Sequence, residues 1–160
     1  MPHMDAAYNL ARWLAGNEPD AQDVVQDACL RAFRFFDGFH GGNSRSWLLR
    51  IVRNAFYDWL RQNRGGPATT QPDEFLHEIP EDKPGPDAAL RDKVDHAVLH
   101  QAIAELPVEF REVLILRELE RFSYKEISDV ADLPIGTVMS RLARARAQLR
   151  LLLIPRLQTP

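Results

Sequence analysis

The last part of the chain carries a run of cations with no acid among them. Between Gly136 and Pro160 there are five arginines and no aspartate or glutamate. Guanidinium groups bind phosphates by charge and pair with guanine edges through two hydrogen bonds. The run therefore favours contact with nucleic acid over the alternative, an amphipathic surface helix whose arginines are only solvated. The five are Arg141, Arg144, Arg146, Arg150 and Arg156.

Helical spacing sorts this segment into two faces. At about 100° per residue, an apolar stripe within about 40° of Val138 comprises Leu142, Ala145 and Leu149. The opposite face, which includes Ala147, is small and polar, so that it can enter a major groove. We expect Arg144 to pair with a guanine edge, with Arg141 and Arg146 on the flanking phosphates. The predicted duplex-binding residues are Thr137, Met139, Ser140, Arg141, Ala143, Arg144 and Arg146.

A second cationic face is predicted on a helix at residues 44–63. Its apolar stripe comprises Leu48, Ile51, Val52, Ala55 and Trp59. The other face combines arginines with an aromatic ring and an amide, a set that suits single-stranded nucleic acid, because bases stack on rings while phosphates meet arginine. Trp47 fits either a wedge beside the duplex edge or a core aromatic. The predicted strand-binding residues are Trp47, Arg50, Arg53, Asn54, Tyr57 and Arg61.

The elements that hold these faces are all helical, so the predicted fold class is all-α with two small domains. Helices are expected at 5–16, 20–36, 44–63, 87–106, 109–121, 123–131 and 135–153. Asp20 is the expected N-cap of the second, and Ser123 with Glu126 has capping-box spacing. A helix-turn-helix is predicted, because a helix after Ser123 is followed by a turn at Asp132–Pro134 and then by the basic helix.

Residues 65–86 divide the chain. They hold five of its eleven prolines and three of its eight glycines, with no helical or strand period, which predicts a flexible linker. Residues 67–100 carry 3 basic and 8 acidic side chains, whereas residues 1–66 carry 8 and 7 and residues 101–160 carry 9 and 8. The acidity is therefore a central block, away from both nucleic-acid faces.

Composition gives little support for an enzyme or a membrane protein. Cys29 is the single cysteine, no signal peptide opens the chain, and the aliphatic run at 151–154 cannot span a bilayer, so a cytoplasmic protein is expected. His96 and His100 have metal-ligand spacing but no third ligand nearby. No phosphate loop, nucleophile elbow or zinc-protease motif occurs. We therefore expect no catalytic residues, no metal and no cofactor.

Three segments resemble the sigma-70 family, specifically its short extracytoplasmic-function (ECF) group. DAQDVVQDACLRAFRFFDGF is similar to the region 2.2 helix and its continuation, and RSWLLRIVRNAFYDWLRQNR to regions 2.3 and 2.4. LPVEFREVLILRELERFSYKEISDVADLPIGTVMSRLARARAQL resembles region 4 over nearly every residue. The resemblance implies region 2 at residues 1–64, an acidic linker at 65–86 and region 4 at 87–160.

The family's activity then gives each face an expected role. The resemblance implies that the protein binds core RNA polymerase, reads the promoter -35 element as duplex and captures the melted -10 strand, with Asn54 in the pocket for a flipped base. It implies a linker that mimics RNA charge in the exit path and an anti-sigma partner. The residues matching the family's contact with the clamp of the largest polymerase subunit are Asp23, Gln26, Asp27, Leu30 and Arg31.

Two departures from the family accompany the resemblance. Only about four residues precede Asp5, where the family has a further helix, and the Phe39–Trp47 loop is one residue shorter than usual, which leaves open the base it captures.

Two other functions compete with that of a sigma factor. A helix-turn-helix regulator acting without polymerase would dimerise on a palindrome and would not need the strand-binding face. A mimic that only titrates an anti-sigma factor would not need an acid-free recognition helix.

Overall fold

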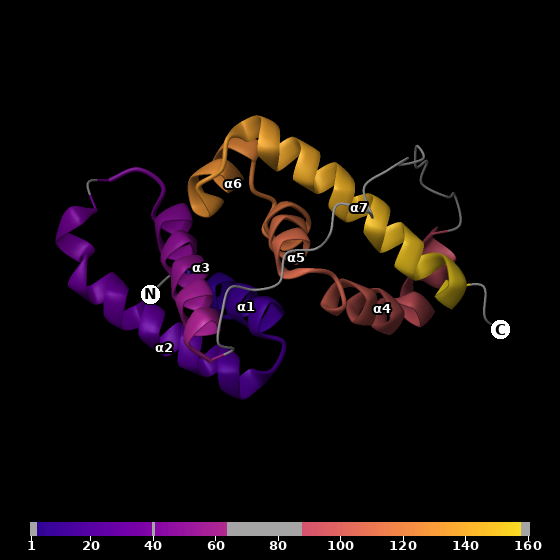
Figure 1. Cartoon of the computed structure of the whole chain (residues 1–160), viewed down its shortest axis with the longest axis horizontal. Coiled ribbons are helices and arrows are strands. Elements are labelled where there is room, and N and C mark those ends of the chain that lie inside the picture. Colours follow the sequence, from indigo (N-terminus) through magenta and orange to yellow (C-terminus); the bar gives the residue numbers. More distant parts are fainter. Residues whose placement is uncertain (1–2, 40, 64–87, 158–160) are drawn as a thin grey trace.

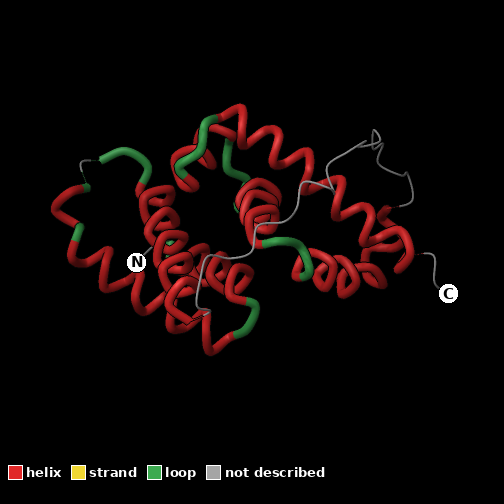
Figure 2. The backbone as a smooth tube through the Cα atoms, in the orientation of Figure 1, coloured by secondary structure: helices red, strands yellow, loops and turns green. Residues whose placement is uncertain are grey.

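The structure is a computed structural model that describes residues 3–39, 41–63 and 88–157; of 88–95 and 157 it describes the backbone only. The predicted linker at 65–86 lies outside the described residues. Within them, helices and loops account for the whole backbone and no strand occurs (Figure 2). The all-α fold class is therefore confirmed for the described part of the chain.

The first module consists of α1 (Met4–Ala15), α2 (Glu18–Arg34) and α3 (Ser44–Asn63), with a short 3-10 turn at Phe36–Gly38. The three helices pack on one another around small and aliphatic side chains. The bounds of α3 are those predicted. The expected N-cap of α2 is wrong, because Asn17, not Asp20, holds that position and its side-chain oxygen accepts the Asp20 N–H at 2.9 Å.

The second module consists of α4 (Ala88–Ala104), α5 (Val108–Leu114), α6 (Tyr124–Ala131) and α7 (Ile135–Leu157). The helix expected at 109–121 instead changes to a π-helical turn at Ile115–Leu119. The predicted capping box is confirmed: the Glu126 N–H donates to the Ser123 hydroxyl at 3.1 Å, and the Ser123 N–H donates to the Glu126 carboxylate at 2.8 Å. Asp132, at a positive φ of 58°, reverses the chain between α6 and α7.

The two modules lie directly against each other. Figure 1 shows α3 beside α6 and α1 beside α5, with the long α7 running over the second module and α4 beneath it. Buried apolar side chains from both modules form one continuous core. Two further contacts join the modules. The Arg111 guanidinium donates to the Leu14 carbonyl at 3.2 Å, and the ring centroids of Trp13 and His100 lie 4.2 Å apart. The first module therefore presents part of its surface to the second rather than to solvent.

Candidate nucleic-acid interface

The outward face of α7 is open to solvent. Val138, Leu142 and Ala145 are at most 1% exposed, and Leu149 is half-buried, so the predicted apolar stripe is confirmed. On the other side Met139 is 51% exposed. Ser140, Ala143 and Arg144 are also exposed, while Thr137 and Arg141 are half-buried. Small side chains and an exposed arginine give this surface the shape and donors that a major groove accepts.

The free face of α7 is shorter than the sequence suggested. Ala147, which helical spacing assigned to the open face, is only 4% exposed, and α7 packs against α4, α5 and α6. The arginines that lie free of acids in the sequence also meet acids from other helices in space. Arg146 pairs with Glu118 at 2.8 Å, and Arg156 pairs with Glu105 of the α4–α5 connection. Both acids are more than 25 residues away along the chain, which is why the local sequence did not reveal them.

The corresponding face of α3 is covered. The Arg53 Nε donates to a Glu112 carboxylate oxygen of α5 at 2.7 Å, and the Tyr57 hydroxyl donates to the other oxygen at 3.3 Å. The Arg53 guanidinium also lies over the Tyr57 ring, 4.4 Å from its centroid. Glu112 has no exposed surface. Arg53 and Tyr57, both predicted strand-binding residues, are therefore half-buried and held by Glu112 of the second module.

Further contacts extend this cover along α3 and the loop before it. The Arg50 guanidinium donates to the Asp129 backbone carbonyl of α6 at 3.1 Å. Arg45 pairs with the Glu120 carboxylate at 3.2 Å, and the Asn43 amide donates to Glu126 at 2.7 Å. Three of the predicted strand-binding residues are nevertheless exposed, namely Arg50, Asn54 and Arg61.

Electrostatics at the covered face follow from burial. Burial raises the pKa of the Glu112 carboxyl above its ordinary value, although the charges of Arg53 and Arg141 oppose the shift. Burial, together with the Glu112 charge, also raises the pKa of the Tyr57 hydroxyl far above its ordinary range. For Arg53, burial acts to lower the pKa, but the Glu112 charge and hydrogen bond outweigh it and the pKa is raised. Arg53 is therefore a permanent cation held against a buried acid.

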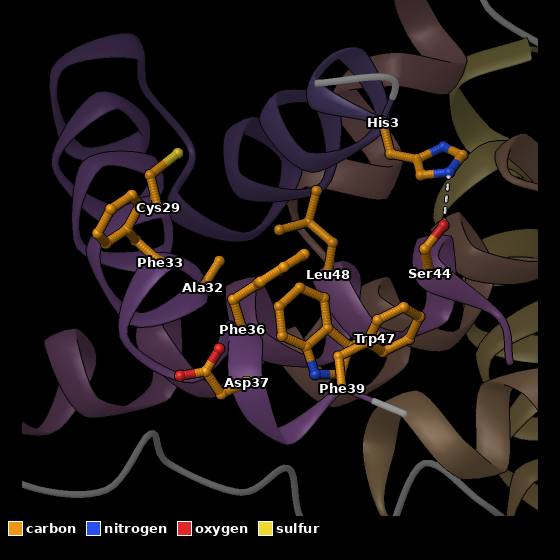
Figure 3. A pocket seen from close by; sticks show the side chains of 10 residues that line it. All are labelled: His3, Cys29, Ala32, Phe33, Phe36, Asp37, Phe39, Ser44, Trp47 and Leu48. Carbon is orange, nitrogen blue, oxygen red and sulfur yellow. Dashed lines mark hydrogen bonds between the residues drawn. The ribbon is translucent and has the colours of Figure 1, made fainter. Parts of the chain in front are cut away.

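Trp47 lies beside a cavity of about 600 Å³ at the end of the first module (Figure 3). Its ring centroid is 5.0 Å from that of Phe39 and 6.4 Å from that of Phe36. The His3 ring and the Ser44 hydroxyl, 3.2 Å apart, lie at another part of the wall. Trp47 is half-buried, and thus neither a free wedge nor a fully enclosed core residue. An aromatic cavity of this kind can receive a planar ring by stacking.

The surface of α2 combines acids with exposed apolar side chains. Asp23 and Gln26 are exposed, and Arg31 is half-buried between Asp27 at 3.1 Å and Asp58 at 2.9 Å. Leu30 is 60% exposed. Sequence reasoning missed the aromatic residues that follow it, of which Phe33 is 88% exposed. The sequence does contain a sign of them: the end of α2 has more aromatic residues in succession than the buried face of one helix can accommodate. The full set is Leu30, Phe33, Phe35 and Phe36.

The remaining sequence candidates do not gather into a site. His100 packs on Trp13, and among the described residues no three potential ligands from His, Cys, Asp and Glu come together. None of the described helices is both long and apolar enough to cross a bilayer.

Comparison with known proteins agrees with the two-module arrangement. The model of sigma-70 region 2 matches residues 1–65, and that of sigma-70, region 4 matches residues 96–149. The chain is 36% identical over 148 residues to the ECF RNA polymerase sigma factor SigE of Mycolicibacterium smegmatis, covering 92% of this chain and 57% of SigE. It is 37% identical over 135 residues to the RNA polymerase sigma-H factor of Pseudomonas aeruginosa, covering 79% of this chain and 69% of that protein.

A solved structure agrees over nearly the whole chain. The sigma factor RpoE of Bartonella quintana, in its complex with the anti-sigma factor NepR, superposes with a TM-score of 0.66 at 28% identity, covering 93% of this chain and 90% of RpoE. The chain is thus an all-helical, two-module protein of the sigma-70 family. Within that family it belongs to the ECF RNA polymerase sigma factors. It spans a little over half the length of SigE and about two thirds of sigma-H.

Proposed function

We propose that the protein is an alternative sigma factor that binds core RNA polymerase and directs initiation at its own promoters. The observation that carries this function is the presence, in one chain and in the family's order, of two modules that each contain a helix with a cationic face. One module alone would fit an ordinary DNA-binding regulator. A regulator acting without polymerase has no use for a face that combines arginine, amide and aromatic ring.

In this function α7 reads the -35 element as duplex. Its outward face is exposed, and its small residues allow the helix backbone to approach the base edges closely. Arg144 pairs with a guanine, while Arg141 and Arg146 bind phosphates on either side and fix the register. Thr137 adds a phosphate contact at the start of the helix, where free backbone amides point outward.

The first module captures the melted -10 strand. Asn54 binds the edge of a flipped base, and Tyr57 and the aromatic cavity beside Trp47 provide stacking surfaces. Arg50, Arg53 and Arg61 hold the backbone phosphates of that strand.

The exposed surface of α2 binds the clamp of the largest polymerase subunit. Asp23, Gln26, Asp27 and Arg31 supply polar contacts around Leu30, and the exposed Phe33 extends the apolar centre that a protein interface needs. The proposed division of the chain is region 2 at 1–64, an acidic linker at 65–86 and region 4 at 87–160. The protein acts in the cytoplasm with promoter DNA, is not an enzyme and needs no cofactor. As with the RpoE complex, an anti-sigma factor is its expected regulator.

Run-off transcription on a genomic promoter library tests this function. Core polymerase is supplied with and without an equimolar amount of the purified protein, and transcripts are sequenced. The expected result is a set of new start sites that share two spaced upstream elements. Tight binding of DNA without any protein-dependent transcript would instead establish an operator-binding regulator, and binding to an anti-sigma factor alone would establish a mimic.

A further inference from the structure

The open face of α7 has an apolar side that the core does not use. Ile135 is 42% exposed and Met139 is 51% exposed. Neither belongs to the apolar side chains that form the core of the described residues or pack against it. Because residues four apart are neighbours on a helix, these two and the exposed Ala143 form one short row rather than scattered contacts with water. A continuous exposed apolar row is typical of a surface that a partner covers.

The other side of the same face is polar. At about 100° per residue, Arg144 lies about 140° around the helix axis from Met139. Ser140 lies between them, and its hydroxyl donates to the Thr137 carbonyl at 3.2 Å, which leaves the oxygen lone pairs to accept a hydrogen bond from outside. The two sides of the face can therefore bind different chemical groups, apolar on one side and polar on the other.

Gly136, at the start of α7, is an independent observation on the same face. It is exposed, it does not have a positive φ, and a Cβ placed there would meet no described atom within 4 Å. Neither its backbone conformation nor packing among the described residues requires glycine. Helical spacing places it between Met139 and Ser140 around the axis. A missing side chain at this position allows another molecule to approach the helix backbone closely.

The major groove offers one apolar group to such a row. Among the four bases, only thymine carries a methyl group on its major-groove edge, whereas the other bases present hydrogen-bond donors and acceptors there. An apolar side chain pressed against a polar edge removes water from it without replacing the hydrogen bonds, which is unfavourable. The thioether side chain of methionine is flexible and polarisable, so it can adapt to a methyl group.

We propose that Met139 determines specificity by selecting a thymine through contact with its 5-methyl group, with Ile135 completing the apolar surface around that methyl. The inference rests on the proposed duplex-reading role of α7 and adds a base to the one assigned to Arg144. Five residues of helix separate Met139 from Arg144, a rise of about 7.5 Å. Because base pairs are spaced about 3.4 Å apart, the thymine lies within about three base pairs of the guanine bound by Arg144.

Removal of single methyl groups from the DNA tests the contact. The full chain selects duplexes from a randomised library, and each thymine of the best-bound duplex is replaced in turn by deoxyuridine, which lacks only the methyl. The affinity of the parent chain should fall about fourfold at one thymine near the guanine, the factor expected for burial of one methyl group. Met139→Ala should bind the duplexes with and without that methyl equally well.

Leu151→Ala is the matched control for loss of an exposed apolar side chain. Leu151 is 57% exposed on the same helix, but it lies about 18 Å further along α7, beyond the buried Ala147. This variant should keep the fourfold effect of the methyl. Circular dichroism of the three chains checks that they are equally folded.

Gly136→Ala tests the close approach of the helix to the duplex. Alanine favours the helix over glycine, so the midpoint of thermal unfolding should stay the same or rise. The affinity for the selected duplex should nevertheless fall at least about fivefold, because the added methyl overpacks a tight contact. The loss should be equal for duplexes with thymine and with deoxyuridine.

The outcomes distinguish this inference from the proposed function. A parent chain that is insensitive to removal of every thymine methyl would overturn the role of Met139, and so would Met139→Ala if it kept the fourfold effect. Full duplex affinity in Gly136→Ala would overturn the close approach on which the contact depends. Methyl-dependent binding by a chain that never supports a transcript with core polymerase would leave the role of Met139 standing and remove the proposed sigma function.

Discussion

The two cationic helix faces differ in what they meet within the free protein. On α7 the face is open, with Met139 half exposed and Arg144 in solvent. On α3 the central arginine is held by a buried glutamate from the other module. The difference shows that a helical wheel finds the side of a helix that avoids its own core, but not whether a second module covers that side.

The largest effect is expected from Asn54→Ala combined with Tyr57→Ala. A base taken out of the stack is held by edge hydrogen bonds and by stacking worth roughly 1–3 kcal/mol. The double variant should keep polymerase binding and -35 affinity but lose open-complex formation on closed duplex, measured by permanganate reactivity of -10 thymines. A pre-melted bubble should restore only part of the activity.

Tyr57→Phe is the matched control, because it keeps the ring and removes only the hydroxyl bonded to Glu112. It should retain open-complex formation and bind single strands slightly more tightly. Normal permanganate reactivity in the Asn54/Tyr57 double variant would place strand capture elsewhere, with the Phe39–Trp47 loop as the next candidate.

Removal of Arg53 should produce the next largest effect, on stability. Arg53→Ala leaves the Glu112 carboxylate buried without its main partner, a change that costs about 3–5 kcal/mol in a fixed core. In this protein the loss of stability cannot exceed the free energy of docking between the two modules, because Glu112 reaches water when the modules separate. Thermal unfolding should therefore change from one transition to two, while Arg50→Ala, which loses only a contact to a backbone carbonyl, keeps one. An unchanged single transition in Arg53→Ala would contradict the docking role of the pair.

On α7, two arginine substitutions should change DNA binding in different ways, one its sequence preference and the other its overall strength. Arg144→Ala should cost about 1–3 kcal/mol and relax the preference at one base of the -35 element. Arg146→Ala should weaken all sequences alike and flatten the salt dependence, because a phosphate contact releases counterions without reading sequence. Selection from a randomised -35 library measures both, and indistinguishable selections would refute the assignment of this face.

The smallest effect concerns pH. Glu112 faces Arg53 and Tyr57 from α3 and Arg141 from α7, and burial between the docked modules raises its pKa above the value of an exposed glutamate, about 4.3. Proton binding therefore favours docking of the modules. The contribution of Glu112 protonation to docking of the modules is complete below the pKa of the exposed carboxyl. It is lost as pH rises through the raised pKa of the buried carboxyl. The midpoint of thermal unfolding should therefore lose this contribution as pH rises in the parent chain, and Glu112→Gln should not show that loss.

Much of the fold was predictable because its signals are local. The bounds of α3, the capping box at Ser123 and Glu126, and the apolar stripe of α7 all follow from residues within a few positions of one another. The N-cap of α2 was misplaced because Asn17 and Asp20, three residues apart, are both good caps and the chain uses the first. The π-helical turn at Ile115–Leu119 has no sequence signal of comparable strength.

The candidate site was predictable only in part, since its cover depends on contacts between distant residues. Glu112 lies 59 residues from Arg53, and in the sequence it reads as one more acid on an amphipathic helix. Ala147 was misassigned for the same reason, because its burial depends on the helices packed against α7 and not on the spacing within α7. Residue type and spacing thus predict which side chains can bind nucleic acid, whereas the exposure of those side chains depends on how the two modules pack.

The central claim is that both faces read DNA within one initiation complex, and site-specific photocrosslinking tests it most directly. A photoreactive residue is placed at Met139 of α7 or at Asn54 of α3, both exposed, and the protein is irradiated with a transcribed promoter. The predicted result is that Met139 crosslinks to the -35 duplex and Asn54 crosslinks to the melted -10 strand, the latter only when core polymerase is present. Crosslinking from Asn54 to closed duplex without polymerase, or none from either position in an active complex, would contradict the account.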